Sequence, residues 1–342
     1  MFKNKTILIT GGTGSFGKAF LKYLLINHKD IKKIIIFSRD ELKQFEMSVQ
    51  FSEKKYPNIR FFLGDIRDLN RLSRAMEEVD YVIHTAALKQ VPAAEYNPFE
   101  VIKTNVIGAQ NIIEACLNSN VKKVIALSTD KACAPINLYG ATKLCSDKLF
   151  ISANNITGKR NLSFSVVRYG NVMGSRGSVI PEFFKQKKSG SINITDKNMT
   201  RFSITMQESI DLVLWALKNS IGGEIFVPKI PSYKILDLAK AVAPEAKINI
   251  VGLRPGEKIH EELITDNESN YAIILKKYYV ILTFLIKKPN NSFYVDQQKL
   301  LKNYINLHKG KVFQKEYSYR SNTNNDFLSV EKLKKLIKTI DY

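Results

Sequence analysis

Two side chains that could exchange a proton stand four residues apart near the middle of the chain, Tyr139 and Lys143. On a helix this spacing puts both on one face. An ammonium close to a phenol favours the phenolate, which would lower the phenol pKa from about 10 toward the range of a general base. Such pairs also arise by accident, and the alternative is a half-buried aromatic residue without a chemical role.

A polar tip, Ser128-Thr129-Asp130-Lys131, comes shortly before this pair. It follows a buried strand expected from Val124 to Leu127, and a loop leads from it into the helix of Tyr139. Ligands of open α/β sheets bind beyond the carboxyl ends of the strands, so a hydroxyl, a carboxylate and an amine here predict acid-base chemistry. The alternative for Asp130 and Lys131 is a solvated turn.

The chain begins with a glycine-rich turn between a strand, Thr6 to Thr10, and a helical pattern, Lys18 to Asn27. Gly11, Gly14 and Gly17 are three apart. A turn of this kind lets the backbone approach a pyrophosphate that faces the helix N-terminus, so it predicts a dinucleotide site. A tight turn without a ligand is the alternative.

The next strand, Lys33 to Arg39, ends where the ribose of the adenosine would lie. An acid at this tip selects NAD, whereas a cation accommodates the 2′-phosphate of NADP. Ser38 and Arg39 occupy the tip and Lys43 follows one turn later, which favours NADP. Asp40 and Glu41 come directly after Arg39 and weaken that preference.

Two further strands carry candidate cofactor contacts at their ends. Asp65 closes a strand from Arg60 and is placed to touch adenine or to serve as a turn carboxylate. A strand from Tyr81 ends in small residues, Ala86 and Ala87, past which a cofactor could run. Lys89, just beyond, is either a solvated lysine or a charge facing a ligand.

Strands alternate with helices throughout the first half of the chain. A helix expected from Asn97 to about Ser119 carries Asn105, for which a buried, hydrogen-bonded structural role is expected. A sixth strand runs from Phe164 to Asn171. This order predicts an α/β fold, a Rossmann-type doubly wound parallel sheet, with residues 1–171 as the NADP-binding domain and some strands returning from later chain.

Residues 172–342 are expected to form mainly a smaller substrate-binding lobe and a C-terminal extension. Cations placed to face a cleft, a threonine and a strand mark this lobe: Arg176, Thr195, Arg201, the strand Glu224 to Pro228 and the run Arg254 to Lys258. Arginine suits a diphosphate, although each one alone could be surface charge. After Glu268 the pattern indicates little beyond a final helix, Ser329 to Thr339.

Composition narrows the class of protein. The 342 residues carry a formal net charge of +20, but the lysines are spread along the chain and no nucleic-acid recognition motif occurs, so no specific nucleic acid is expected as a partner. Three cysteines, an odd number without metal-ligand spacing, predict free thiols and no metal site. No signal peptide or membrane-spanning run is present, and a cytoplasmic protein is expected.

Taken together, the motifs resemble a known superfamily. Thr10 to Gly17, the Tyr139 and Lys143 pair and Arg254 to Lys258 resemble the extended short-chain dehydrogenases/reductases. Within it, four further motifs resemble the UDP-N-acetylglucosamine 4,6-dehydratases: Ser38 to Lys43, Ala86 to Lys89, Ser128 to Lys131 and Arg168 to Asn171. The chain looks closest to the soluble, inverting members that begin pseudaminic acid synthesis for flagellin glycosylation.

The resemblance implies roles for the residues. Tyr139, helped by Lys143, would take the proton of the sugar 4-hydroxyl, and Thr129 would orient that hydroxyl. Lys131 would serve as the base at C5 if its pKa is lowered, and protonated Asp130 would release the 6-hydroxyl as water. NADP would be tightly bound and regenerated in each turnover.

Further residues are carried over from the family. The cofactor set is Gly11, Thr13, Gly14, Ser15, Phe16, Gly17, Ser38, Arg39, Lys43, Asp65, Ile66, Ala86, Ala87, Lys89, Tyr139 and Lys143. Contacts to UDP-N-acetylglucosamine would come from Lys89, Asn171, Thr195, Arg201 and Arg254. A homo-oligomer, dimer or hexamer, is expected. A UDP-N-acetylhexosamine 4-epimerase and a non-catalytic NADP-binding regulator remain as alternatives, and inversion or retention at C5 is open.

Overall fold

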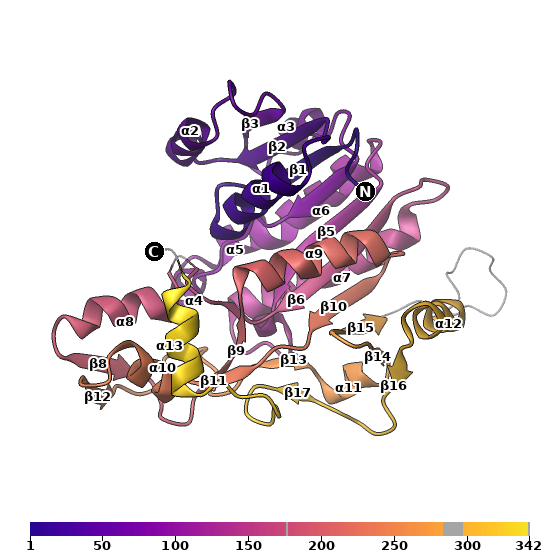
Figure 1. The fold of residues 1–342 in the computed structure, drawn as a ribbon. Coiled ribbons are helices and arrows are strands. Elements are labelled where there is room, and N and C mark those ends of the chain that lie inside the picture. Colours follow the sequence, from indigo (N-terminus) through magenta and orange to yellow (C-terminus); the bar gives the residue numbers. More distant parts are fainter. Residues whose placement is uncertain (176, 283–296, 341–342) are drawn as a thin grey trace.

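A twisted sheet of ten strands organises the part of the chain that the structure describes, residues 1–175, 177–282 and 297–340 of a computed structural model (Figure 1). Seven strands are parallel, in the spatial order β3 (Ile59–Leu63), β2 (Lys33–Ser38), β1 (Thr6–Thr10), β4 (Tyr81–His84), β5 (Lys123–Thr129), β6 (Ser163–Tyr169) and β10 (Glu224–Pro228). The central strands are rich in Ile, Val and Phe because both of their faces are buried. The expected doubly wound parallel sheet is confirmed.

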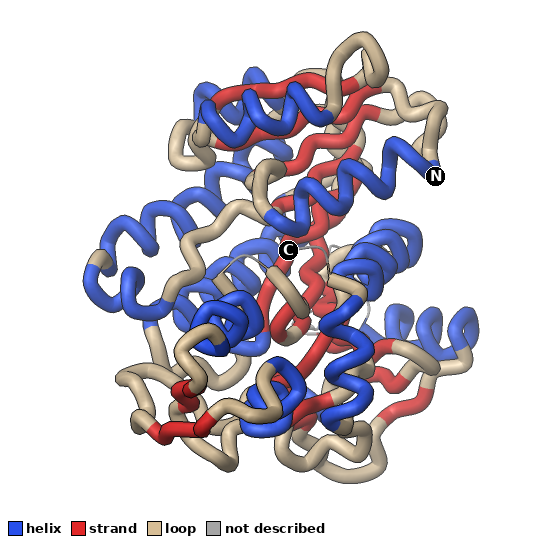
Figure 2. The backbone as a smooth tube through the Cα atoms, turned by 60° about the vertical axis from the view of Figure 1, so that its left-hand side comes forward, coloured by secondary structure: helices blue, strands red, loops and turns tan. Residues whose placement is uncertain are grey.

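Helices cover both faces of this sheet (Figure 2). One face carries α1 (Ser15–Asn27) and α9 (Met206–Asn219), and the other carries α3 (Leu69–Ala75), α6 (Gly108–Leu117) and α7 (Leu138–Ser152). Helix α2 (Glu41–Gln50) follows β2 and packs near β3. Parallel strands therefore all deliver their carboxyl ends to one edge of the molecule, where the candidate site lies.

The long helix expected from Asn97 is one rod with a change of pitch in its middle. It consists of α5 (Pro98–Ile102), a π-helical turn (Lys103–Ile107) and α6. Asn105 lies in the π turn, 2% exposed, and exchanges hydrogen bonds of 2.9 Å with the backbone of Leu88. The structural role expected for Asn105 is confirmed, and it ties this helix to the loop after β4.

Later chain returns to the large sheet. Strand β10, expected in the smaller lobe, pairs with β6 in parallel, so that placement was wrong: its five residues are all buried, as an interior strand requires. Three antiparallel strands extend the same edge, β15 (Tyr278–Leu282), β14 (Ala272–Ile274) and β16 (Lys311–Val312). Helix α12 (Gln297–His308) lies beside β14.

The smaller lobe has its own apolar core. Its elements are α8 (Val179–Lys187), α10 (Ile235–Val242), α13 (Val330–Lys338), the pair β8 (Ser191–Ile194) and β12 (Lys247–Ile250), and the sheet of β11 (Ser232–Lys234), β9 (Thr200–Ile204) and β7 (Asn171–Val172). The final helix is confirmed: Ser329 caps α13 by accepting a hydrogen bond from the Lys332 backbone. Arg176 lies outside the described residues.

Short elements complete the chain: α4 (Val91–Tyr96), 3₁₀ turns at Asp130–Ala132 and Ala153–Ile156, β13 (Glu262–Ile264), α11 (Asp266–Ser269) and β17 (Tyr319–Arg320). Strand β13 follows the Arg254–Lys258 run and pairs antiparallel with β17. This pairing brings the C-terminal stretch next to that part of the chain. Among the described helices, none has the length and apolar character that a membrane span needs.

Candidate active site

The glycine turn between β1 and α1 has the shape that a bound dinucleotide requires. Gly11 has φ +62°, and a Cβ there would lie 2.8 Å from the Ala86 backbone. A Cβ on Gly17 would lie 2.4 Å from the Gly12 carbonyl oxygen, so this glycine lets helix and turn pack closely. Gly14 and Ser15 are exposed at the start of α1. The residues present therefore fit a pyrophosphate at this helix N-terminus.

Cations and two carboxylates, Asp65 and Asp40, surround the position expected for the adenosine. Arg39 Nη1 lies 3.7 Å from Asp65 Oδ2, and Arg67 holds the same carboxylate at 2.7 Å. Burial raises the pKa of Asp65, but its hydrogen bonds to Arg67 outweigh burial and the net shift is downward. Lys43 pairs with Asp40, the cap of α2. Arg67 is a cation at this end that the sequence analysis did not select.

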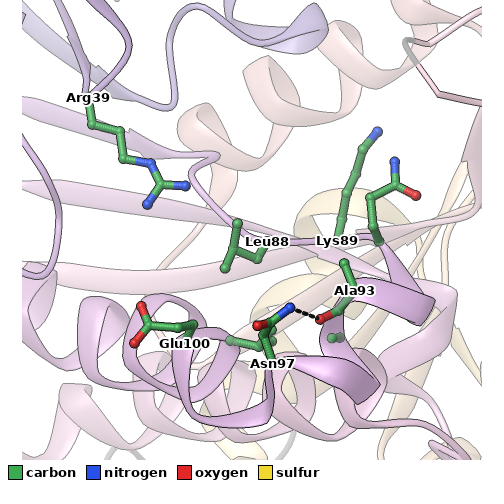
Figure 3. A pocket seen from close by; sticks show the side chains of 9 residues that line it. Arg39, Leu88, Lys89, Ala93, Asn97 and Glu100 are labelled. Carbon is green, nitrogen blue, oxygen red and sulfur yellow. Dashed lines mark hydrogen bonds between the residues drawn. The ribbon is translucent and has the colours of Figure 1, made fainter.

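The remaining cofactor candidates lie along the same edge. Ser38 is buried and accepts a hydrogen bond of 2.9 Å from Gln44. Thr13 and Ile66 are buried, and Phe16, Ala86 and Ala87 are partly buried. A pocket of about 360 Å³ extends from the tip of β2 to the loop after β4 (Figure 3). Its lining includes Arg39, Leu88, Lys89 and Val101.

The candidate catalytic turn, Asp130–Ala132, forms where β5 ends. The strand runs to Thr129, and residues Asp130–Ala132 then form a 3₁₀ turn. Thr129 donates a hydrogen bond of 3.0 Å to Asp130 Oδ1, and Lys131 Nζ lies 3.0 Å from the same oxygen. The hydroxyl, carboxyl and amine predicted to converge at this tip therefore do converge.

Helix α7 is fixed against this turn. Asn137 caps it by accepting from the Gly140 N–H at 2.8 Å, and the Asn137 amide donates to the Gly256 carbonyl oxygen at 2.7 Å. A Cβ on Gly140 would lie 2.1 Å from the Lys131 carbonyl oxygen, so only glycine allows this approach. Tyr139, on the same turn of helix, is thereby held beside the candidate catalytic turn.

Burial governs the ionisation of the Tyr139 and Lys143 pair. Both side chains are almost inaccessible, 8% and 3% exposed. Burial raises the pKa of Tyr139 to about 12, although the Lys131 charge and a hydrogen bond to Thr129 oppose it. Burial also lowers the pKa of Lys143, partly offset by Asp147. The expectation that Lys143 would lower the phenol pKa does not hold, because desolvation dominates.

Lys131 lies between two carboxylates. Its Nζ is 3.0 Å from Glu261 Oε1 as well as 3.0 Å from Asp130 Oδ1, and it donates to Asn171 Oδ1 at 3.4 Å. Burial lowers the pKa of Lys131, but the two negative charges outweigh burial and the net shift is upward. The condition of a lowered pKa, set for Lys131 as a base, is therefore not met.

A raised pKa favours the charged form of Lys131 but the neutral form of Asp130. It is fully buried, and burial raises its pKa, with a further rise from Glu261 and opposition from Lys131. Its second oxygen, Oδ2, has no hydrogen-bond partner among the described residues. A carboxyl that favours its protonated form is suited to acting as a proton donor.

The candidate substrate residues differ in where they lie. Asn171 contacts Lys131, and Lys89 lies near enough for Lys131 to lower its pKa further, after burial as the main cause. Arg201 is 6% exposed, and its guanidinium donates to two backbone carbonyls and lies 3.8 Å from Glu261. Thr195 is buried with Met199 as its partner, and Arg254 is exposed on the loop beside α7.

Two residues of this site were missed. Glu261 precedes β13, and Tyr233 on β11 is buried within reach of the charges of Arg201 and Lys131 and of a hydrogen bond to Asn171. Glu261 and Glu262 point in different directions, as neighbours on an extended chain do, and Glu262 pairs with Arg320. This alternation was the one signal in the sequence that could have pointed to Glu261. It does not show that Lys131 is the partner of Glu261. The described residues contain no His, Cys, Asp and Glu cluster that could bind a metal.

The chain is similar to known proteins in sequence and in structure. Residues 7–283 match the model of a family described as polysaccharide biosynthesis protein. A UDP-N-acetylglucosamine 4,6-dehydratase (inverting) of Campylobacter jejuni is 52% identical over 339 residues, 98% of each chain. A UDP-glucose 4-epimerase of Rickettsia akari is 43% identical over 100% of this chain and 98% of its own. The X-ray structure of Pen from Bacillus thuringiensis is 40% identical with a TM-score of 0.86, covering 99% and 98%.

Proposed function

Because the chain belongs to the polysaccharide biosynthesis protein family and is an extended short-chain dehydrogenase/reductase, we propose that it is a UDP-N-acetylglucosamine 4,6-dehydratase that inverts C5. The product would be a UDP-2-acetamido-2,6-dideoxy-hexos-4-ulose, made as the first step of pseudaminic acid synthesis for flagellin glycosylation. The reaction oxidises C4, removes water across C5 and C6, and reduces C6.

One observation carries the choice of dehydration. Asp130, a buried carboxyl with a raised pKa, lies 3.0 Å from the Lys131 amine, and its neighbour Thr129 is hydrogen-bonded to Tyr139. Dehydration needs an acid for the departing 6-hydroxyl and a base for the C5 proton, in addition to the base at the 4-hydroxyl. This part of the chain supplies three such groups: Asp130 and Lys131 contact each other, and Tyr139 is hydrogen-bonded to Thr129, the neighbour of Asp130.

The proton steps can be assigned to these groups. In its phenolate form, which the charge of Lys131 favours and burial opposes, Tyr139 would take the proton of the 4-hydroxyl, and the C4 ketone makes the C5 hydrogen acidic. Lys131 removes that hydrogen and Asp130 protonates the leaving 6-hydroxyl. Lys131 then returns a proton to C5 on the face that inverts it. The proton that Tyr139 gains balances the one that Asp130 loses. A bound nicotinamide would accept the C4 hydride and return it at C6, so no cofactor is consumed.

A proton transfer within the turn can give Lys131 the neutral form that a base needs, despite its raised pKa. Transfer of one proton from Lys131 Nζ to Asp130 Oδ1, across 3.0 Å, converts the ion pair into a neutral amine and a protonated carboxyl. These are the base and the acid that the elimination requires. Substrate that excludes water from the turn would favour the neutral pair, because burial disfavours both charges. After elimination the ion pair is restored.

The decisive test is the product formed in heavy water. The proposal predicts that purified protein converts UDP-N-acetylglucosamine to a 4-keto-6-deoxy sugar with solvent deuterium at C5, read by NMR. The second candidate is a UDP-N-acetylhexosamine 4-epimerase, favoured by the similarity to the Rickettsia akari protein. Unlabelled UDP-N-acetylgalactosamine as sole product would establish it instead.

A non-catalytic regulator is tested separately. The matched pair is Lys131→Ala and Lys148→Ala, the latter an exposed lysine at the far end of α7. If the protein is an enzyme, Lys131→Ala loses product formation and retains NADP binding, whereas Lys148→Ala keeps both. A regulator would bind NADP in all three forms and give no product in any.

The proposal also covers the choice of cofactor, the oligomeric state and the location of the protein in the cell. NADP is preferred over NAD because Arg39, Lys43 and Arg67 lie at the adenosine end.

A homo-oligomer, dimer or hexamer, is supported by the exposed large apolar side chains Tyr96, Phe99 and Ile107 on the α4 to α6 segment. Light scattering of the purified protein measures the oligomer number, and a monomer at working concentration would contradict it. The enzyme would act in the cytoplasm.

A further inference from the structure

Glu261 contributes a buried negative charge to the catalytic turn from a distant part of the chain. It is 2% exposed, and its Oε1 lies 3.0 Å from Lys131 Nζ and 3.8 Å from Arg201 Nε. Its Oε2 is buried without a hydrogen-bond partner among the described residues. Leaving a carboxylate oxygen buried and unpaired costs free energy, which the contacts of Oε1 with Lys131 and Arg201 must offset.

The backbone of Glu261 is held on both sides by Ser321. The Glu261 N–H donates to Ser321 Oγ at 2.9 Å, and the Ser321 N–H donates to the Glu261 carbonyl oxygen at 2.8 Å. Ser321 Oγ also lies 2.7 Å from Thr200 Oγ1, next to Arg201. Ser321 directly follows β17, so the C-terminal stretch fixes the position of the carboxylate.

The charges around Lys131 can be named. Two carboxylates contact it, and the other ionisable groups within electrostatic reach of it or of Glu261 are Arg201, Lys89, Lys258, Tyr139 and Tyr233. Glu261 is thus the negative charge that Asp130 and Lys131 have in common: it raises the pKa of both.

We propose that Glu261 is a positioning residue for the dehydration, which holds the Lys131 side chain at the turn and whose charge sets the pH range in which Asp130 and Lys131 work. The inference rests on the proposed function. Glu261 needs no contact with the sugar for this role. It acts through Lys131 and Asp130.

The direction of the effect follows from the signs. Because Glu261 raises the pKa of Lys131 and of Asp130, replacing its carboxylate by an amide lowers both. A bell-shaped rate profile is bounded by the two apparent pKa values of the coupled pair, so both limbs move to lower pH. A charge at this distance shifts a pKa by about one unit or more, so a displacement of about one pH unit is expected.

The experiment compares the pH dependence of kcat in four proteins: wild type, Glu261→Gln, Glu261→Asp and Glu262→Gln. Glu262 is the matched control, an adjacent carboxylate that pairs with Arg320 at 3.1 Å and does not contact Lys131. We expect Glu261→Gln to move the whole profile by about one unit to lower pH and Glu261→Asp to move it less, because its charge is retained farther away. Glu262→Gln should superimpose on wild type.

A purely structural role for Glu261 would lower the rate at every pH without displacing the profile, and that result overturns the inference. If Glu261→Gln does not fold, Glu261→Asp carries the test, since a profile identical to wild type would also overturn it. Absence of dehydration by wild type and Glu262→Gln would instead refute the proposed function, so the two failures are distinguishable.

Discussion

Gly140 packs against Lys131 so closely that a Cβ on the glycine would lie 2.1 Å from the lysine carbonyl oxygen. This contact joins helix α7, which carries Tyr139 and Lys143, to the 3₁₀ turn that carries Asp130 and Lys131. The relative position of phenol, carboxyl and amine is therefore set by backbone against backbone, which cannot be relieved by a side-chain rotation.

Gly140→Ala tests this contact. Inside a helix, alanine is favoured over glycine by about 1 kcal/mol, so propensity alone predicts a more stable protein. Overlap with the Lys131 carbonyl predicts the reverse, a loss of about 1–3 kcal/mol in the free energy of unfolding and a lower kcat. Urea unfolding gives the sign, and a variant as stable as wild type would show that the turn gives way without cost.

Asp130→Asn separates the two halves of the proposed reaction. The amide keeps the shape of the carboxyl but cannot donate an acidic proton, so loss of water should slow by on the order of 10²–10⁴-fold. Oxidation at C4 depends on Tyr139 and should continue, so reduced cofactor accumulates on addition of sugar nucleotide and is visible by absorbance. Asp211→Asn, on the exposed side of α9, is the control. Unchanged product formation by Asp130→Asn would remove Asp130 from the acid role.

The fold could be predicted from the sequence to the extent that local pattern determines it. Buried parallel strands such as β2 are runs of Ile and Phe, and the turn from Gly11 to Gly17 needs glycines for steric reasons visible in the spacing. Strand β10 was misplaced because its pattern marks it as buried but does not say beside which strand. The π turn around Asn105 has no signature in residue spacing.

The site could be predicted only in part, for a related reason. Thr129, Asp130 and Lys131 are adjacent in sequence, so their convergence needs only the end of one strand. The ionisation of Lys131 depends on Glu261, which is brought there by a separate lobe and a C-terminal serine. Likewise the pKa of Tyr139 reflects how completely it is buried, a property of the assembled fold.

His84 gives the protein a predictable sensitivity to acid. It lies at the end of β4, 1% exposed, with Nδ1 2.8 Å from Thr10 Oγ1, and burial lowers its pKa to about 3. The unfolded chain protonates this residue near pH 6.5, so between about pH 6.5 and 3 it binds more protons than the folded chain. Stability present above pH 6.5 is therefore lost as pH falls, by ~5 kcal/mol in total from this group.

The contribution of His84 is isolated by difference. Urea unfolding of wild type and His84→Phe at a series of pH values should show a shallower acid loss in the variant. The same series with His308→Gln, a partly exposed histidine on α12, should follow wild type. Parallel curves for wild type and His84→Phe would mean that His84 accepts a proton without unfolding.

Arg39→Ala tests how the cofactor is chosen. Arg39 is 51% exposed at the tip of β2, and its only described ion pair, to Asp65 at 3.7 Å, is shared with the closer Arg67. Its guanidinium can therefore turn to a 2′-phosphate at little cost, and removing it should weaken NADP by about tenfold, or ~1.4 kcal/mol, relative to NAD. Fluorescence titration gives both Kd values. Arg60→Ala, an exposed arginine on β3 that bonds only nearby backbone, should leave their ratio unchanged. Equal weakening of NADP and NAD by Arg39→Ala would place Arg39 on the shared part of the cofactor and assign the choice to Lys43 or Arg67.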